Sequence, residues 1–246
     1  MIDISGFLVV ILIGIVVIVL SYLLDHIWAA AAPARIVYLF IRAPGVVVHE
    51  CSHILGCLVT GARIQNIVLL SREGGSVTYK KPLIPYIGDV IISTAPLFLI
   101  PLFLSLVTGI FGTYLGCTFP EFPATIDSKE TFLALLGAIG AMFSLNLVAS
   151  FNGWFLLYLY LAVSLVLSVA PSAQDVKNAA VGIVLITLAG IMIVWSDISV
   201  LNYLLGECMH LLEIGFTLGL VYGLIVLAFS LPLVIWYAWQ KRDAVF

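Results

Sequence analysis

Apolar segments of twenty or more residues constrain this chain more than any other feature. The first two cover about 6–32 and 36–60, and others follow to the end of the chain. A helix needs about 20 apolar residues to cross the hydrocarbon core of a bilayer. Of the 246 residues, 63% are hydrophobic and 9% are charged, whereas about a quarter are charged in soluble domains. The chain is therefore predicted to be an integral membrane protein.

The length leaves room for about six transmembrane helices and no separate soluble domain. We predict an all-α, polytopic, multi-pass membrane protein with one membrane-embedded domain over 1–246. Four later spans are expected at about 87–115, 131–169, 179–195 and 209–239. The segment 131–169 is long for a single span, so a seven-span alternative turns at Asn152-Gly153.

The segment Ala62–Pro82 differs in composition from the rest of the chain. It is rich in β-branched residues and is broken by the pair Gly74-Gly75. Such a pattern is typical of two short strands joined by a turn. We therefore predict a small β-hairpin directly after the second span.

Basic residues predict the orientation, because lysine and arginine gather in cytoplasmic loops. In the six-span arrangement, one group of basic residues lies on the same side as both termini. We predict that this side is cytoplasmic and that the protein lies in the cell membrane. The group consists of Arg63, Arg72, Lys80, Lys81, Lys177, Lys241 and Arg242. No basic run indicates nucleic acid. The four cysteines form no CxxC pair, and the six-span arrangement would place Cys117 and Cys208 together on the far side, where a disulfide between them is one prediction.

The sequence His49-Glu50-Cys51-Ser52-His53 places three ionisable groups in the middle of the second apolar segment. Ionisable groups are costly inside a membrane, so they normally have a function there. Residues four apart share one face of a helix, and both histidines can therefore reach one ion. This H-E-x-x-H spacing is typical of zinc sites in which the glutamate is a general base. A catalytic zinc site needs a third protein ligand.

These features together resemble the site-2 protease family of intramembrane zinc peptidases. The motif within a span, the glycine-ended helix and the hairpin sequence GGSVTY carry the resemblance, which covers about 46–178. It is closest to the compact M50-type branch that lacks a PDZ domain. The resemblance implies a catalytic core over about 36–178 and a hairpin beside the active site. It also implies that an aspartate from a later span is the third zinc ligand.

The chain departs from that family where the aspartate is expected, because it has no L-D-G sequence. The sequence SLNLVAS resembles the asparagine part of the family pattern and contains Asn146. In the six-span arrangement, Asp89 and Asp175 remain on the side of the histidines. The resemblance favours Asp175, and Pro171 and Ser172 before it would allow a helix break and a new helix cap. Asn146 and Asn152 are candidate substrate-binding amides, with interhelical hydrogen bonding as the alternative.

The sequence therefore predicts a zinc-dependent intramembrane endopeptidase. His49, His53 and Asp175 would bind Zn²⁺, and Glu50 would be the catalytic base. The expected partners are the lipid bilayer and membrane-protein substrates cut in transmembrane or juxtamembrane segments, with the active site open to the cytoplasm. The alternative is a non-catalytic metal-binding regulator or transporter on the same scaffold. The sequence predicts no oligomeric state.

Overall fold

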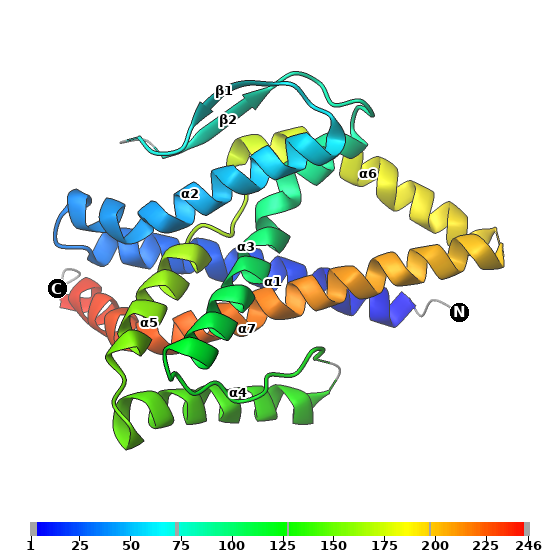
Figure 1. Ribbon diagram of the computed structural model, residues 1–246. Coiled ribbons are helices and arrows are strands. Elements are labelled where there is room, and N and C mark those ends of the chain that lie inside the picture. Colours follow the sequence, from blue (N-terminus) through cyan, green and yellow to red (C-terminus); the bar gives the residue numbers. More distant parts are fainter. Residues whose placement is uncertain (1–3, 72–73, 127, 197, 244–246) are drawn as a thin grey trace.

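The computed structural model describes residues 4–71, 74–126, 128–196 and 198–243 (Figure 1). Six of its helices, counted over these residues, are long and apolar enough to cross a membrane. This confirms the predicted fold class, including the two-stranded sheet after the second helix. The elements are α1 (Ile4–Ala31), α2 (Arg35–Thr60), β1 (Ile64–Val68), β2 (Ser76–Tyr79), α3 (Ile87–Tyr114), α4 (Lys129–Phe143), the π-helical turn η1 (Ser144–Ala149), α5 (Gly153–Val166), α6 (Ala173–Trp195) and α7 (Ser199–Asp243).

Local sequence signals explain where α2 and the hairpin begin and end. Gly61 adopts a left-handed conformation (φ 68°) after α2, which glycine does without steric cost. The strands then pair antiparallel, with Ile64 opposite Tyr79 and Val68 opposite Ser76. Figure 1 shows the hairpin running back over α2. The hairpin therefore covers the helix that carries the H-E-x-x-H motif.

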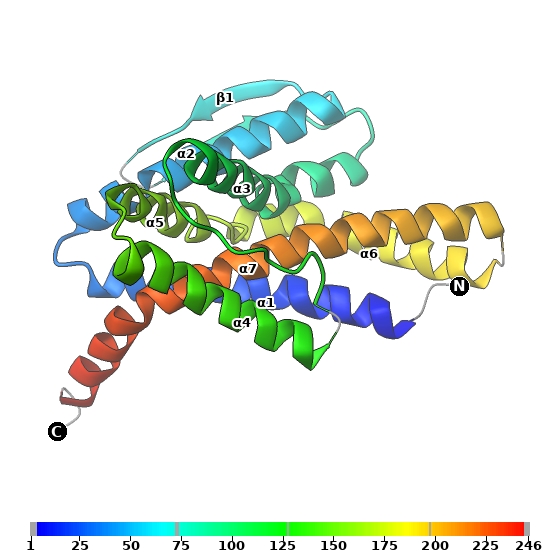
Figure 2. The same cartoon turned by 60° about the horizontal axis from the view of Figure 1, so that its bottom comes forward.

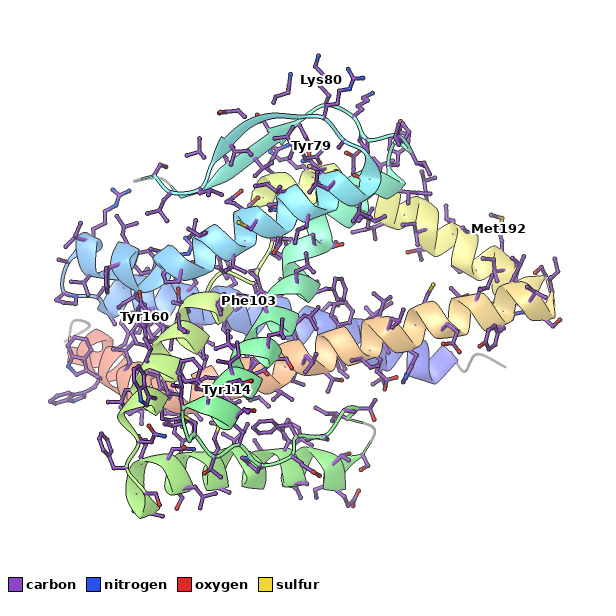
Figure 3. The ribbon with its side chains drawn as sticks, in the orientation of Figure 1. Tyr79, Lys80, Phe103, Tyr114, Tyr160 and Met192 are labelled. Atoms are coloured by element: carbon purple, nitrogen blue, oxygen red, sulfur yellow. The ribbon has the colours of Figure 1, made fainter. Side chains whose placement is uncertain are left out.

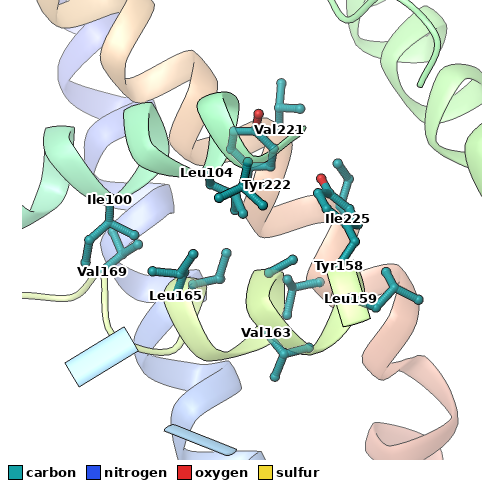
Figure 4. Close-up of a cluster of buried hydrophobic side chains, with 14 of the residues drawn as sticks. Ile100, Leu104, Tyr158, Leu159, Val163, Leu165, Val169, Val221, Tyr222 and Ile225 are labelled. Carbon is teal, nitrogen blue, oxygen red and sulfur yellow. The ribbon is translucent and has the colours of Figure 1, made fainter. Parts of the chain in front are cut away.

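The main core lies where α3, α5 and α7 meet (Figure 4). Ile100 and Leu104 of α3, Tyr158 of α5 and Ile225 of α7 have no exposed surface. The Thr108 hydroxyl is 3.2 Å from the Tyr158 hydroxyl and 3.1 Å from that of Tyr222, so the buried polar atoms of three helices share one cluster. This core fixes α5, and α5 in turn positions the motif helix.

Helices α1 and α7 run in the same direction. Gly14 lies against Phe216, Val17 against Gly219, and Leu20 against Gly223. Further along both helices, the Trp28 indole donates to the Ser230 hydroxyl at 2.9 Å. Figure 1 accordingly shows the two termini at opposite ends of the molecule. The prediction that both termini share one side is wrong, because the first and last spans are parallel.

The segment 131–169 is not one span. It contains α4, η1 and α5, with a turn at 150–152, and the Asn152 side chain caps α5 by accepting from the Trp154 amide. The predicted bend at Asn152-Gly153 is thus present. Figure 2 shows α4 and α5 as two separate helices. Helix α5 has 14 residues, about 21 Å, which is short of the roughly 30 Å hydrocarbon core.

Helices α5 and α6 follow one another in the same direction. Helix α5 runs parallel to α2, because Gly45 meets Ser164 and His49 meets Ser168. Helix α6 runs antiparallel to α3, since its Gly182 packs on Tyr86 while its N-terminus reaches the level of Ile92. A seven-span arrangement needs these neighbours to be antiparallel, so it is wrong as well. The non-helical stretch 167–172 instead separates two helices that run in the same direction.

All four cysteines are free thiols. Cys117 is buried just after α3, and Cys208 is exposed near the start of α7. Helix α7 is parallel to α3, because Phe98 lies against Gly215 and, further along both helices, Thr108 lies against Tyr222. The two cysteines therefore lie toward opposite ends of the bundle, and the disulfide between them is ruled out by this fold.

Candidate metal centre

Helix α2 contains Pro44 about one turn before the motif, and α5 satisfies the backbone groups around it. Pro44 has no N–H, so the carbonyl of Phe40 lacks its helical donor. The Tyr160 hydroxyl donates to that carbonyl at 3.0 Å. The next amide, that of Gly45, donates to the Ser164 hydroxyl at 2.8 Å. A proline within a membrane helix is tolerated when neighbouring side chains pair with the freed groups in this way.

Helix α2 is in close contact with the end of α5. A Cβ atom on Gly45 would lie 2.6 Å from the Ser168 hydroxyl and would overlap the Ser164 carbonyl. This contact places the Ser168 carbonyl 2.6 Å from Nδ1 of His49. A carbonyl only accepts hydrogen bonds, so Nδ1 of His49 carries the proton and Nε2 offers a lone pair.

The second histidine is held in the same way by α3. Nδ1 of His53 is 2.8 Å from the Ile92 carbonyl. The helices meet closely there, because a Cβ on Gly56 would lie 2.9 Å from the Ile92 Cα. In the neutral ring, Nε2 of His53 is therefore also an acceptor. A backbone carbonyl that fixes the tautomer of each histidine is the usual support of a metal ligand.

The structure brings Asp175 to these two histidines. Its Oδ1 lies 3.4 Å from Nε2 of His53, and its Oδ2 lies 3.8 Å from Nε2 of His49. Ser172 begins α6 as an N-cap: its amide and hydroxyl donate to Oδ2 of Asp175 at 2.8 Å and 2.6 Å. The cap therefore orients the carboxylate and leaves Oδ1 free to face the ring nitrogens.

The three side chains form one buried group of acceptors. One ligand atom from each of His49, His53 and Asp175 lies within 4.8 Å of the others. The two Nε2 atoms are 3.1 Å apart, and with both Nδ1 atoms protonated neither imidazole has a proton to place between them. Two lone pairs and a carboxylate that converge without a donor need a cation. The group can hold a metal ion.

Glu50 lies beside this group and beneath the turn of the hairpin. It is 6% exposed and close enough to both histidines and to Asp175 to interact with them electrostatically. A Cβ atom on Gly75 would lie 2.7 Å from Oε1 of Glu50. The second glycine of the turn therefore allows the hairpin backbone to approach the carboxylate.

The base of the hairpin is attached to α3 and α6 through Tyr79. Its hydroxyl donates to Asp89 at 3.4 Å and lies 3.5 Å from the Asn178 amide. Burial, together with the nearby Asp89 carboxylate, raises the pKa of Tyr79 to about 12. Asp89 also accepts from the Tyr86 amide at the start of α3. The alternative third ligand, Asp89, therefore has a structural role outside the buried group.

The structure does not bring Asn146 and Asn152 to the buried group. The Asn146 amide bonds to both backbone groups of Thr118 and to the Met142 carbonyl. Asn152 donates to the Leu115 carbonyl at 2.9 Å. These contacts lie at the start of α5, whereas His49 meets its end, about 21 Å away along the 14-residue helix. The structure therefore gives these amides hydrogen bonds to the residues that follow α3, in place of the predicted substrate binding at the metal.

Sequence reasoning missed the groups that orient the histidines. The Ser168 and Ile92 carbonyls are backbone groups, so the residue type does not indicate their role. Pro44 was a usable signal, because it implies that the Phe40 carbonyl needs another donor. Comparisons with protein-family models, with curated proteins and with solved structures found no match.

Proposed function

We propose that this protein is an intramembrane zinc-dependent endopeptidase. The observation that carries the proposal is the buried convergence of His49, His53 and Asp175 with Glu50 beside them, within helices long enough to span a membrane. Ionisable groups at such a place normally mark a functional site. A metal site used only for structure would be closed by a fourth protein ligand, and within the described residues the group of ligands is three.

The spacing of the ligand atoms supports zinc. Zn²⁺ binds imidazole nitrogen and carboxylate oxygen at about 2.0–2.2 Å, so two ligands at tetrahedral angles are separated by about 3.3–3.5 Å. The two Nε2 atoms are 3.1 Å apart, and Oδ1 of Asp175 lies 3.4 Å from Nε2 of His53, both near this separation. The distance of 3.8 Å to Nε2 of His49 is measured from the other carboxylate oxygen, Oδ2. Nitrogen and oxygen donors of this kind suit zinc, and two histidines with one carboxylate form a recognised catalytic set.

The residues divide the chemistry of peptide hydrolysis among them. Zn²⁺ held there would supply Lewis acidity, which polarises the scissile carbonyl and makes a water molecule acidic. Glu50 would accept the proton of the attacking water and deliver it to the leaving amine. Its burial between α2 and Gly75 keeps the carboxylate near the reacting atoms. Ser168 and Ile92 would keep both imidazoles in the ligand tautomer throughout the cycle.

The proposed substrates are transmembrane or juxtamembrane segments of membrane proteins. A peptide bond within a helix is sterically protected, so a substrate must be extended at the site. The hairpin supports this requirement, because a two-stranded sheet has free edges that can pair with an extended chain. Its turn already lies against Glu50, and a segment bound along it would be led toward the catalytic base.

The proposal is tested with Glu50→Gln in purified, reconstituted protein. This change keeps the size of the side chain and removes only the base, so we expect full zinc content and a loss of hydrolysis of at least about 100-fold. Zinc is measured by mass spectrometry and cleavage with a model membrane substrate. Glu130→Gln is the matched control, because it makes the same change at an exposed glutamate at the start of α4. Zinc binding without any cleavage by the unchanged protein would favour the metal-binding regulator or transporter, and cleavage by zinc-loaded Glu50→Gln would exclude the role of Glu50.

A further inference from the structure

A cationic surface lies at the base of the hairpin. It consists of Arg63, Lys80 and Lys81, all exposed. The Lys80 amide donates to the Arg63 carbonyl at 2.9 Å, so these two residues face each other across the strands. Figure 3 shows Lys80 projecting away from the helices, while Tyr79 lies on the side that faces them.

The charges of this cationic surface have no ion-pair partner among the residues that the structure describes. The nearest acid on the packed side, Asp89, is bonded to the Tyr86 amide and to Tyr79. Three adjacent positive charges without internal partners favour an anionic partner outside the chain.

The cationic surface is continuous with exposed apolar residues. Leu83, Ile84 and Tyr86 are 81%, 60% and 51% exposed. They connect the hairpin to α3, where one candidate span begins at Ile87, and the preceding candidate span ends at Thr60. The Leu83 amide donates to the Thr60 carbonyl at 3.1 Å, so both span ends lie together. Basic side chains next to apolar ones, at the end of two spans, match the headgroup region of a bilayer.

We propose that Arg63, Lys80 and Lys81 bind the headgroups of anionic lipids and thereby hold the hairpin at a fixed depth over α2. The apolar residues enter the adjacent acyl region, as side chains of interfacial anchors do. Each basic residue of a polybasic segment adds an attraction to an anionic surface that is on the order of the thermal energy. Salt screens this attraction. The binding requires neither metal nor peptide hydrolysis, so it stands or falls independently of the proposed enzyme activity.

The test is amide hydrogen exchange of β1 and β2 in lipid nanodiscs. The full chain is compared in phosphatidylcholine alone and in phosphatidylcholine mixed with phosphatidylglycerol. Three charges predict that the anionic lipid slows exchange in the hairpin by about tenfold to 100-fold at low salt. High salt is expected to remove the effect in the unchanged protein, and this measurement needs no variant. The triple change Arg63→Gln, Lys80→Gln, Lys81→Gln is expected to remove it at low salt.

Lys129→Gln is the matched control, because it removes one exposed charge at the start of α4, and it should leave the lipid effect intact. Equal hairpin exchange in both lipids would overturn the proposal, as would a triple variant that still responds to phosphatidylglycerol. Slowing by an acidic peptide but not by phosphatidylglycerol would also overturn it, in favour of a protein partner.

Discussion

A single methyl group at Gly45 is expected to weaken the metal centre without touching any ligand. In Gly45→Ala the new Cβ would lie 2.6 Å from the Ser168 hydroxyl, whereas ordinary contact begins at 3.4 Å. The Ser164 carbonyl is closer still, so the backbones of α2 and α5 have to separate. A side-chain rotation alone would not relieve this overlap, because a carbonyl group is part of the main chain.

The size of the effect follows from the hydrogen bond that the separation would stretch. A movement of at least about 0.8 Å, which the Ser168 hydroxyl alone requires, would lengthen the 2.6 Å bond between His49 and the Ser168 carbonyl to about 3.4 Å or more, beyond the useful range of such bonds. Loss of an orienting partner of this kind lowers metal affinity by about 10–100-fold. Overpacking would also destabilise the fold by about 1–3 kcal/mol.

The assay is a zinc competition titration with a chromogenic chelator on detergent-solubilised protein. Gly140→Ala in α4 is the control, because nothing lies within 4 Å of its added Cβ. It should keep the zinc affinity of the unchanged protein. If Gly45→Ala binds zinc as tightly as Gly140→Ala while remaining folded, then the α2–α5 contact does not orient His49, and the reasoning is refuted.

Two further predictions concern the third ligand and the topology. Asp175→Ala should lose most bound zinc, because one of three protein ligands disappears. Asp89→Ala should retain zinc and loosen only the base of the hairpin. Zinc content is measured by mass spectrometry, and full zinc content in Asp175→Ala would exclude Asp175 as a ligand. Cysteine labels at the exposed positions Leu83 and Trp239, in a variant without the native cysteines, should react from opposite sides of the membrane, with Leu83 cytoplasmic on account of the basic residues beside it. Labelling of both positions from one side would contradict the parallel arrangement of α1 and α7.

The charge count illustrates how a sequence argument can reach the wrong topology. It assumed that every long apolar segment crosses once and that consecutive spans alternate in direction. The chain violates both assumptions after α3: α4 is joined to α5 by a turn at 150–152, and α5 and α6 then run the same way. The sequence contained the local signals for these breaks, Asn152 and Pro171. Their consequence depends on which helices the resulting pieces pack against, and this is a property of the whole bundle.

The two asparagines show the same limit at the level of single residues. A buried amide can bind substrate or join two helices, and its residue type is the same in both cases. Asn146 lies in η1, before the start of α5, whereas the metal ligands lie near the end of α5, and its amide bonds to the backbone of Thr118 and Met142. Only the position of the 115–118 loop decides between these uses.

The sequence by itself determined the membrane class, the hairpin and the histidine pair. These features are local: apolar length, β-branched strands around Gly74-Gly75, and the four-residue spacing of His49 and His53 depend only on neighbours along the chain. The tertiary structure decided how the ligand atoms are presented. Asp175 meets the histidines because α6 begins where α5 stops, and the tautomers are set by the Ser168 and Ile92 carbonyls. Those contacts join residues 39 to 126 positions apart, and their geometry arises from helix packing, which no local pattern in the sequence specifies.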